Sequence, residues 1–149
     1  MIRNAKIEEA ELIAKYNREA AVEAGNNPLN YDKSIKWVKY IIKNPNSWFF
    51  LVFEKEEKVV SILLVTFEWS DWRNGNWYLI QSVFTLPEYR KQWCFKALLK
   101  KVKNISSEDI NSCWLKLEVR NDNLRAQTVY KNIWFNDSEH QVFTLENKK

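Results

Sequence analysis

The chain has 149 residues, of which 46% are hydrophobic and 28% are charged, and this composition is typical of one globular domain with its own core. No apolar run approaches the roughly 18 residues that a transmembrane helix needs, and the N-terminal segment lacks the apolar centre of a signal peptide. With one histidine, two cysteines and a net charge of +4, we expect no metal site, no nucleic-acid partner and a cytoplasmic location.

Hydrophobic periodicity predicts a mixed α/β protein with a central sheet and helices on its faces. In chain order, the predicted elements are a strand at 2–6, helices at 7–25 and 30–45, strands at 48–54, 59–69 and 77–85, a helix at 95–103, a strand at 114–119, a helix at 121–133 and a last strand at 140–146. The charged turn at 55–58 is expected to close a hairpin, and Asn123 is a natural N-cap.

Glycine is unusually scarce for a fold with this many turns. Average usage of about 7% would give roughly ten glycines in this length, whereas the sequence has two, beside eight tryptophans. Because glycine supplies the positive φ angles that tight turns need, two glycines are too few for the predicted elements.

The segment "PEYRKQWCFKALL" (87–99) joins a predicted strand to a predicted helix. Together with "FEWSDWRNGNWYLIQSVFTL" before it and "LEVRNDNLRAQTVYKNIWF" after it, this segment resembles the GCN5-related N-acetyltransferase (GNAT) superfamily, over residues 2–143. The EWSDWRNG turn followed by an IQSV strand resembles one bacterial branch. The resemblance implies a single domain (1–149) with an α/β acyl-CoA N-acyltransferase fold: a central, mostly antiparallel sheet, splayed at the fourth strand and flanked by about four helices.

The superfamily signature, Arg/Gln-x-x-Gly-x-Gly/Ala, corresponds here to residues 90–95, and the resemblance implies a loop that holds the pyrophosphate of coenzyme A. The implied cofactor-binding residues are Ser82, Val83, Phe84, Thr85, Arg90, Lys91, Gln92, Trp93, Cys94, Phe95, Lys96, Asn123 and Tyr130. The backbone N–H of Val83 is expected to polarise the thioester carbonyl. The alternatives are an ordinary strand-to-helix turn and a buried strand paired on both sides.

The resemblance also implies that Tyr130 is the general acid for the departing thiolate, with Asn123 two helical turns before it on the same face. Alternatively, Tyr130 is a core aromatic residue and Asn123 only a helix cap. Glu68 is our first candidate for the general base, because a carboxylate partly buried beside Trp69 would have a raised pKa; Glu23 and Asp71 are the other candidates.

The EWSDWRNG turn has two open interpretations. Trp69 and Trp72, with Glu68, Asp71 and Arg73, would form a wall of the acceptor site that stacks on a cation or binds a carboxylate. Alternatively, the turn is an ordered hairpin held by Asp71 and Arg73.

Five tryptophans fall where the resemblance leads us to expect glycine: Trp37, Trp48, Trp93, Trp114 and Trp134. Some bacterial lineages read the codon UGA as glycine, whereas other codes read it as tryptophan. We therefore hypothesise that these positions are glycines rendered as tryptophan. Glycine at position 93 would let the main chain approach the pyrophosphate closely, and an indole there would either occupy the phosphate position or swing outward at a cost in backbone energy.

The resemblance implies an acetyl-CoA-dependent N-acetyltransferase that moves an acetyl group to a primary amine by direct attack in a ternary complex. Its partners would be acetyl-CoA and the amine, without a metal, nucleic acid or membrane, and a homodimer is compatible with the sequence. The alternative is a catalytically impaired acyl-CoA-binding or interaction module that keeps the fold, because Trp93 obstructs the loop.

Overall fold

The computed structural model describes residues 1–146, which divide after Glu118 into two compact units. The first unit contains every strand assigned in the described residues, and the second contains one helix. The elements of the first unit are β1 (Ile2–Asn4), η1 (Ile7–Glu9), α1 (Ala10–Glu23), α2 (Tyr31–Lys43), β2 (Trp48–Lys55), β3 (Lys58–Ser70), β4 (Gly75–Thr85), η2 (Pro87–Tyr89), α3 (Cys94–Glu108) and β5 (Ser112–Leu117). That the whole chain is a single domain stays a prediction.

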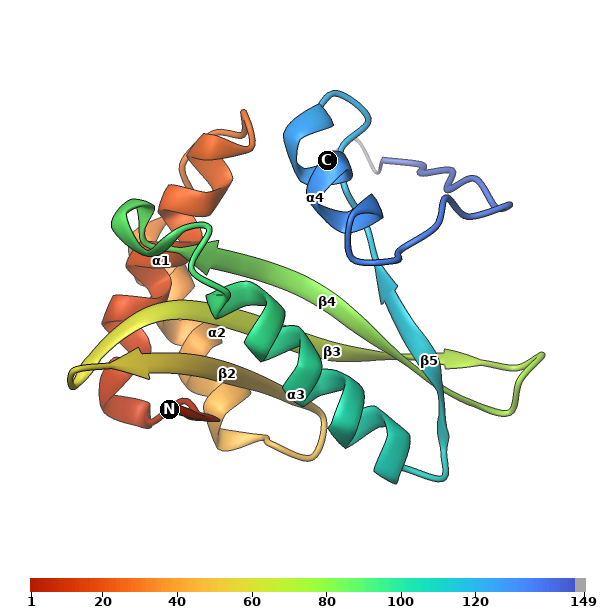
Figure 1. Cartoon of the computed structure of the whole chain (residues 1–149), viewed down its shortest axis with the longest axis horizontal. Helices are drawn as coiled ribbons and strands as arrows, with labels where there is room; N and C mark the ends of the chain where they lie inside the picture. Colours follow the sequence, from red (N-terminus) through yellow and green to blue (C-terminus); the bar gives the residue numbers. More distant parts are fainter. Residues whose placement is uncertain (147–149) are drawn as a thin grey trace. The chain divides into compact units, whose positions relative to one another are not determined.

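The strands form one sheet in the order β1-β2-β3-β4-β5 (Figure 1). All neighbours are antiparallel except β4 and β5, which are parallel. The parallel pair requires a crossover, and α3 supplies it across one face of the sheet. The structure thus confirms the predicted mixed, mostly antiparallel sheet.

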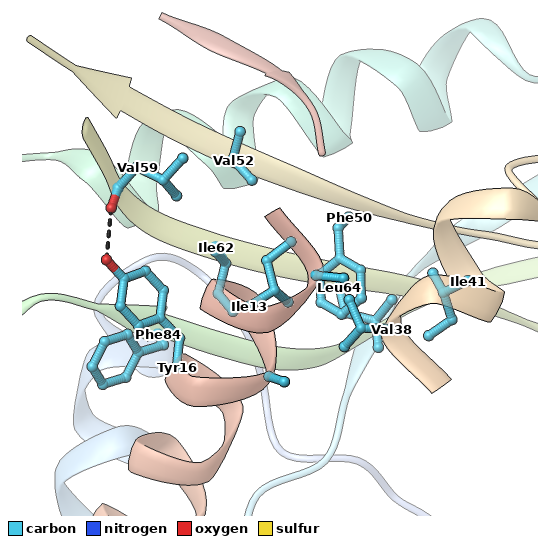
Figure 2. Close-up of a cluster of buried hydrophobic side chains, with 12 residues drawn as sticks. Ile13, Tyr16, Val38, Ile41, Phe50, Val52, Val59, Ile62, Leu64 and Phe84 are labelled. Atoms are coloured by element: carbon cyan, nitrogen blue, oxygen red, sulfur yellow. Dashed lines mark hydrogen bonds between the residues drawn. The ribbon is translucent and has the colours of Figure 1, made fainter. Parts of the chain in front are cut away.

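The main core lies between the sheet and the helices α1 and α2 (Figure 2). Ile13 of α1 and Val38 of α2 are fully buried against alternate residues of β2 and β3. The hydroxyl of Tyr16 donates a 2.8 Å hydrogen bond to the carbonyl of Val59, and its ring lies 4.9 Å from that of Phe84. Each fully buried apolar side chain of this kind contributes about 1.5–3 kcal/mol, so this face fixes α1 over β3 and β4.

The opposite face of the sheet carries α3, whose buried residues Leu98, Leu99 and Val102 recur at helical spacing. At its C-terminal end, the Tyr78 hydroxyl of β4 donates a 3.0 Å hydrogen bond to Asp109. Burial, with the neighbouring Asp109 carboxylate, raises the pKa of Tyr78 to about 12. The α3–β5 turn then returns to β4, where the amide of Asn76 donates to the carbonyl of Asn111 at 2.7 Å.

Most predicted boundaries are confirmed within a few residues. The two-residue turn between β2 and β3 consists of Glu56 and Glu57, both with positive φ, which is the geometry of a tight hairpin. The helix predicted at 95–103 is longer, because α3 continues to Glu108. Asn30, at the start of α2, accepts a hydrogen bond from the amide of Lys33 at 2.9 Å and caps that helix.

The second unit contains α4 (Leu124–Lys131), and Asn123 is its N-cap as predicted, since its side chain accepts from the amide of Ala126 at 3.1 Å. The predicted last strand at 140–146 is wrong: the structure assigns no strand there, and Val142, Phe143 and Leu145 are exposed. An alternating pattern becomes a strand only where a neighbouring strand accepts its hydrogen bonds, and these residues have no assigned strand partner. Among residues 1–146, no helix is both long and apolar enough to cross a bilayer.

Candidate active site

The strand β4 is paired on both sides along only its first half. Its residues 76–80 pair with β5, whereas its residues up to Thr85 continue to pair with β3. β5 ends at Leu117, opposite Ile80, and points away from the second half of β4 (Figure 1), so the strand edge of residues 81–85 faces no β5 residue. This is the predicted splay, and it leaves backbone groups of β4 available to an extended ligand.

A β-bulge coincides with the start of the splay. Two residue steps on β3, from Leu63 to Val65, correspond to three steps on β4, from Val83 to Ile80. The extra residue lies at Gln81–Ser82, so the strand bends there and its backbone groups leave the regular ladder. Bulges beside active sites re-aim backbone groups in this manner, and this bulge directly precedes Val83.

The structure places the predicted coenzyme-binding residues of the first unit on one continuous segment from β4 to α3: Ser82, Val83, Phe84, Thr85, Arg90, Lys91, Gln92, Trp93, Cys94, Phe95 and Lys96. Phe84 and Cys94 are buried, and the side chains of Lys91, Gln92, Trp93 and Lys96 are exposed. The segment therefore consists of a packed part, which contains Phe84 and Cys94 and which we call the frame, and an exposed loop at residues 91–93.

Arg90 ties the loop to the frame. Its Nε donates to the carbonyl of Thr85 at 2.9 Å, one of its terminal nitrogens donates to Glu23 of α1 at 2.6 Å, and its guanidinium lies 5.7 Å from the ring of Phe84. Ser61 of β3 supports the same strand end, since its hydroxyl donates to the carbonyl of Phe84 at 2.8 Å. Arg90 thus holds the loop in position, and its charge is matched by Glu23.

The backbone of the loop is shaped for an anion. Lys91 has φ of 62° and Trp93 has φ of 67°, and Trp93 is the N-cap of α3. Such alternation turns successive N–H groups toward one side, which is a common arrangement for binding phosphate. The first helical hydrogen bond runs from Ala97 to the carbonyl of Trp93 at 2.8 Å, so the amides of Cys94 and Lys96 precede the helical ladder and lie at the positive end of the helix dipole.

The indole of Trp93 points outward and is 72% exposed. The ammonium group of Lys96 lies 4.6 Å from the centroid of its ring. Of the two predicted alternatives, the structure therefore shows the outward one, with the backbone in the left-handed region. For a residue other than glycine, that conformation costs roughly 1–2 kcal/mol.

Two of the three candidate bases are engaged in ion pairs. Glu68 is exposed and pairs with Lys116 at 2.9 Å, so the partial burial that we expected is wrong: this end of β3 extends beyond the helices that cover the sheet. The strand register also separates Glu68 from Val83. The partner of Val83 on β3 is Leu63, and Leu63 lies about 17 Å from Glu68 along the strand, at roughly 3.3 Å per residue. A thioester held at Val83 is out of direct reach of Glu68. Glu23 is paired with Arg90, as described above.

Asp71 is the third candidate, and it lies still farther along the hairpin, beyond Glu68. The EWSDWRNG turn is at the opposite end of β4 from the loop, and Asp71 accepts a hydrogen bond from the amide of Trp72 at 2.9 Å. This placement favours the ordered hairpin over the acceptor wall.

In the second unit, Asn123 and Tyr130 lie at the two ends of α4. Burial raises the pKa of Tyr130 above its usual value, so its hydroxyl keeps its proton at neutral pH, as a general acid must. Its ring packs edge-to-face with Phe135, with centroids 6.2 Å apart. These observations fit both the acid and the packed aromatic residue.

Sequence reasoning missed the contributions of Ser61 and Glu23 to the frame. Their partners are distant in sequence, and periodicity gives no signal for such pairs. A pocket lined by Arg18, Glu19, Val22, Glu23 and Pro28 opens beside this frame on α1. Among residues 1–146, no group of three or more histidine, cysteine or acidic side chains is arranged to hold a metal ion.

The β4 strand is paired on one side only beyond its parallel pairing with β5, and a loop whose backbone N–H groups are arranged to bind an anion leads into α3. This combination is characteristic of the acyl-CoA N-acyltransferases. The acetyltransferase (GNAT) family model matches residues 10–133. The chain belongs to this family.

Solved structures agree with this assignment. A structure described as a possible acetyltransferase from Clostridium difficile 630 is 32% identical, with a TM-score of 0.92, covering 100% of this chain and 98% of its own. The aminoglycoside N-acetyltransferase AAC(6')-Iy in complex with CoA has a TM-score of 0.80 at 12% identity, covering 98% of this chain and 93% of its own. The ribosomal-protein-alanine N-acetyltransferase of Brucella melitensis biovar Abortus 2308 has a TM-score of 0.76 at 11% identity, covering 99% and 98%. The last two show the fold alone. A comparison with curated protein sequences gives no significant match.

Proposed function

We propose that this protein transfers an acetyl group from acetyl-CoA to a primary amine by direct attack in a ternary complex in the cytoplasm. The amine nitrogen, after losing one proton, bonds to the thioester carbon while the carbon–sulfur bond breaks. The observation that carries the proposal is the one-sided pairing of β4 beyond Ile80, immediately before a loop shaped for an anion. Family membership supports the same chemistry.

The loop is proposed to bind the pyrophosphate of coenzyme A through backbone N–H groups at the start of α3. Lys91 and Lys96 are exposed beside these groups and would add favourable charge, whereas Arg90 is committed to Glu23. Charge-assisted hydrogen bonds of this kind are shorter and roughly twice as strong as neutral ones. The freed edge of β4, from Ser82 to Thr85, would bind the pantetheine arm.

The N–H of Val83 is proposed to stabilise the oxyanion, because Val83 follows the bulge, on the part of β4 that pairs with β3 but not with β5. Removing one such donor typically costs about 10²–10³-fold in kcat. Tyr130 is proposed as the acid that protonates the departing sulfur, and Asn123 as a contact of the pantetheine. We propose that Glu68 accepts the proton of the amine only through an intervening water, since the β3–β4 register places Glu68 far from Val83.

We also propose that Trp93 and Trp134 stand where the functional protein has glycine. Trp134 has φ of 70° and is 85% exposed, which matches the left-handed backbone and exposure of Trp93. Trp114 has a nearly extended φ of 157° and is 72% exposed. An indole that is mostly exposed buries little apolar surface, so burial does little to offset the left-handed backbone of the first two.

Trp37 and Trp48 have no such backbone requirement, and for them the glycine hypothesis depends on the codons alone. Trp37 lies in a helix and packs on Phe50, with ring centroids 5.9 Å apart, and Trp48 lies 5.6 Å from Tyr40. The gene sequence tests all five positions. UGA codons are expected at the recoded sites, and UGG at Trp93 and Trp134 would overturn the proposal.

The proposed activity is tested by following thiol release from acetyl-CoA with a panel of primary amines. The panel includes an aminoglycoside and a peptide with N-terminal alanine, since the fold relatives above are named for such acceptors. We expect turnover with Trp93→Gly and slower turnover with the unaltered chain. Trp72→Gly, at an exposed hairpin residue, is the matched control and should behave as the unaltered chain.

Binding is measured in parallel by thermal stabilisation with acetyl-CoA. Acetyl-CoA binding without turnover of any amine would support the non-catalytic module, which the comparisons do not favour. No stabilisation of either the unaltered chain or Trp93→Gly would contradict the acetyltransferase proposal itself.

A further inference from the structure

Gln81 is an exposed polar residue of β4 that has no role in the reaction as proposed above. It lies at the bulge, two residues before Val83. The two residues are about 7 Å apart along the strand at roughly 3.3 Å per residue, and a glutamine side chain spans most of that distance. Gln81 is therefore much nearer than Glu68 to a thioester held at Val83.

The side chain of Gln81 lies on the face of the sheet that packs against α1 and α2. Leu64 of β3 is buried in the main core on this face (Figure 2), and Thr66, two residues later, projects from the same face because side chains alternate along a strand. The Nε2 of Gln81 donates a 3.3 Å hydrogen bond to the hydroxyl of Thr66, so the two side chains share this face. Thr66 is half-buried and Gln81 is exposed, so the face emerges from under the helices at this pair.

The hydrogen bond to Thr66 leaves the oxygen end of the Gln81 amide available. Oε1 accepts no hydrogen bond within residues 1–146, whereas Nε2 is engaged with the hydroxyl. A carboxamide oxygen is an uncharged acceptor with two lone pairs. Gln81 therefore presents a neutral hydrogen-bond acceptor beside the β4 edge that β5 leaves unpaired.

We propose that Oε1 of Gln81 accepts one N–H of the acceptor amine and so directs the nitrogen lone pair at the thioester carbon. The inference rests on the proposed acetyl transfer, and it adds the residue that holds the amine. The neutral amine keeps this hydrogen bond while the nitrogen–carbon bond forms and the carbon–sulfur bond breaks. Its other proton passes to water, from which Glu68, two residues after Thr66 on the same face, is proposed to take it.

This arrangement selects primary amines over secondary amines. A neutral primary amine has two N–H bonds, of which one stays on Gln81 and the other is lost during the attack. A neutral secondary amine has one N–H bond, and that proton cannot both remain on Gln81 and pass to water. A site that depends on such a hydrogen bond discriminates against a substrate that cannot make it.

Thr66 acts through Gln81 and is a positioning residue. An exposed glutamine side chain has several rotatable bonds, and fixing them when a substrate binds costs conformational entropy. The hydroxyl of Thr66 holds the amide before the amine arrives, which reduces that cost. Thr66 is therefore expected to influence the KM for the amine and not the binding of acetyl-CoA.

The test of Gln81 uses the full chain with Trp93→Gly, in which turnover is expected. The probes are the aminoglycoside and the alanine peptide of the panel above, each also prepared with every primary amine monomethylated. Gln81→Met keeps the length of the side chain and removes the amide. It should lower kcat/KM roughly tenfold for the primary amines and much less for the methylated ones. Gln81→Glu keeps an acceptor oxygen and should recover the preference for primary amines.

A matched pair of variants tests Thr66. Thr66→Val keeps the shape of the side chain and removes the hydroxyl, so it should raise the KM for the primary amines roughly threefold or more. Thr66→Ser restores the hydroxyl and should recover most of that loss. Equal KM values for the valine and serine variants would show that the hydroxyl does not position Gln81.

The remaining outcomes separate this inference from the proposed function. An equal loss for primary and methylated amines in Gln81→Met would overturn the inference, because no N–H would then be held there. So would weaker binding of acetyl-CoA by Gln81→Met in calorimetric titration, or lower thermal stability with unaltered amine kinetics, which would make the pair with Thr66 a cross-strand contact only. No turnover of any probe would contradict the proposed acetyl transfer, and the inference would fail with it.

Discussion

Trp37 and Trp93 have the same side chain in opposite settings. Trp37 lies in α2, where any residue adopts the helical backbone, and its half-buried ring packs on Phe50 of the core. Trp93 lies in a loop with φ of 67°, and its ring is 72% exposed over Lys96. Packing offsets the loss of side-chain freedom at the first position, whereas the second has backbone strain with little compensating burial.

This difference shows at which kinds of position this glycine-poor fold tolerates a large residue. A fold can replace glycine by a large residue in a helix or strand if the ring finds a surface to cover. It cannot do so without cost where the main chain must be left-handed. The loop before α3 is such a place, and it is also where we propose that a diphosphate binds.

The largest effect on stability is expected for Trp37→Gly. Removing a fully buried tryptophan costs about 3–5 kcal/mol, and glycine in a helix interior adds about 1 kcal/mol. Because Trp37 is half-buried, we expect a loss of about 3 kcal/mol in the free energy of unfolding, measured by urea denaturation. A neutral or stabilising result would contradict the distinction between Trp37 and Trp93, and it would extend the glycine proposal to position 37.

Trp48→Gly should cost less, about 2 kcal/mol, because Trp48 is half-buried at the first residue of β2, where it packs on Tyr40. The same denaturation experiment measures it. A larger loss than that of Trp37→Gly would show that the order of the two packed sites is wrong.

The opposite sign is expected at the left-handed positions. Trp93→Gly and Trp134→Gly should each raise the free energy of unfolding by about 1–2 kcal/mol, through relief of the backbone. Alanine at the same positions, which keeps a Cβ, is the matched control and should give little of this gain. If alanine stabilises the protein as much as glycine does, the gain comes from removing an exposed indole and not from relief of the left-handed backbone.

The smallest effect concerns the other end of α3, far from the loop. Tyr78→Phe removes the hydrogen bond to Asp109 and should cost about 1 kcal/mol near neutral pH. Because the pKa of Tyr78 is raised to about 12 in the folded protein, its stabilisation is present below pH 10 and is lost as the pH rises from about 10 to about 12. Stability curves against pH should therefore converge for the two proteins in that window. Curves that stay parallel would contradict the assignment.

The sequence predicted the elements well because the core residues repeat with the period of their helix or strand. Ile13, Val38 and Leu98 each follow such a period and are each fully buried. The site was predictable in part, since residues 82–96 form one continuous segment. The splay at β4 was predicted from the family resemblance, because periodicity alone favoured a strand paired on both sides.

The errors have physical causes. Glu68 was expected to be partly buried beside Trp69, but both residues are exposed, because this end of β3 extends beyond the helices (Figure 1), which no local pattern reveals. The segment 140–146 alternates as a strand should, yet its pattern says nothing about whether another strand pairs with it. The contact of Arg90 with Glu23 joins residues 67 apart in sequence, and only the folded chain brings them together.

Calorimetric titration with acetyl-CoA tests most directly whether an unobstructed main chain at residue 93 admits the diphosphate. The unaltered chain, Trp93→Ala and Trp93→Gly should bind in increasing order, with the glycine variant at least tenfold tighter than the unaltered chain. Equal affinities for all three would contradict the account, because the side chain at residue 93 would then have no influence on the site.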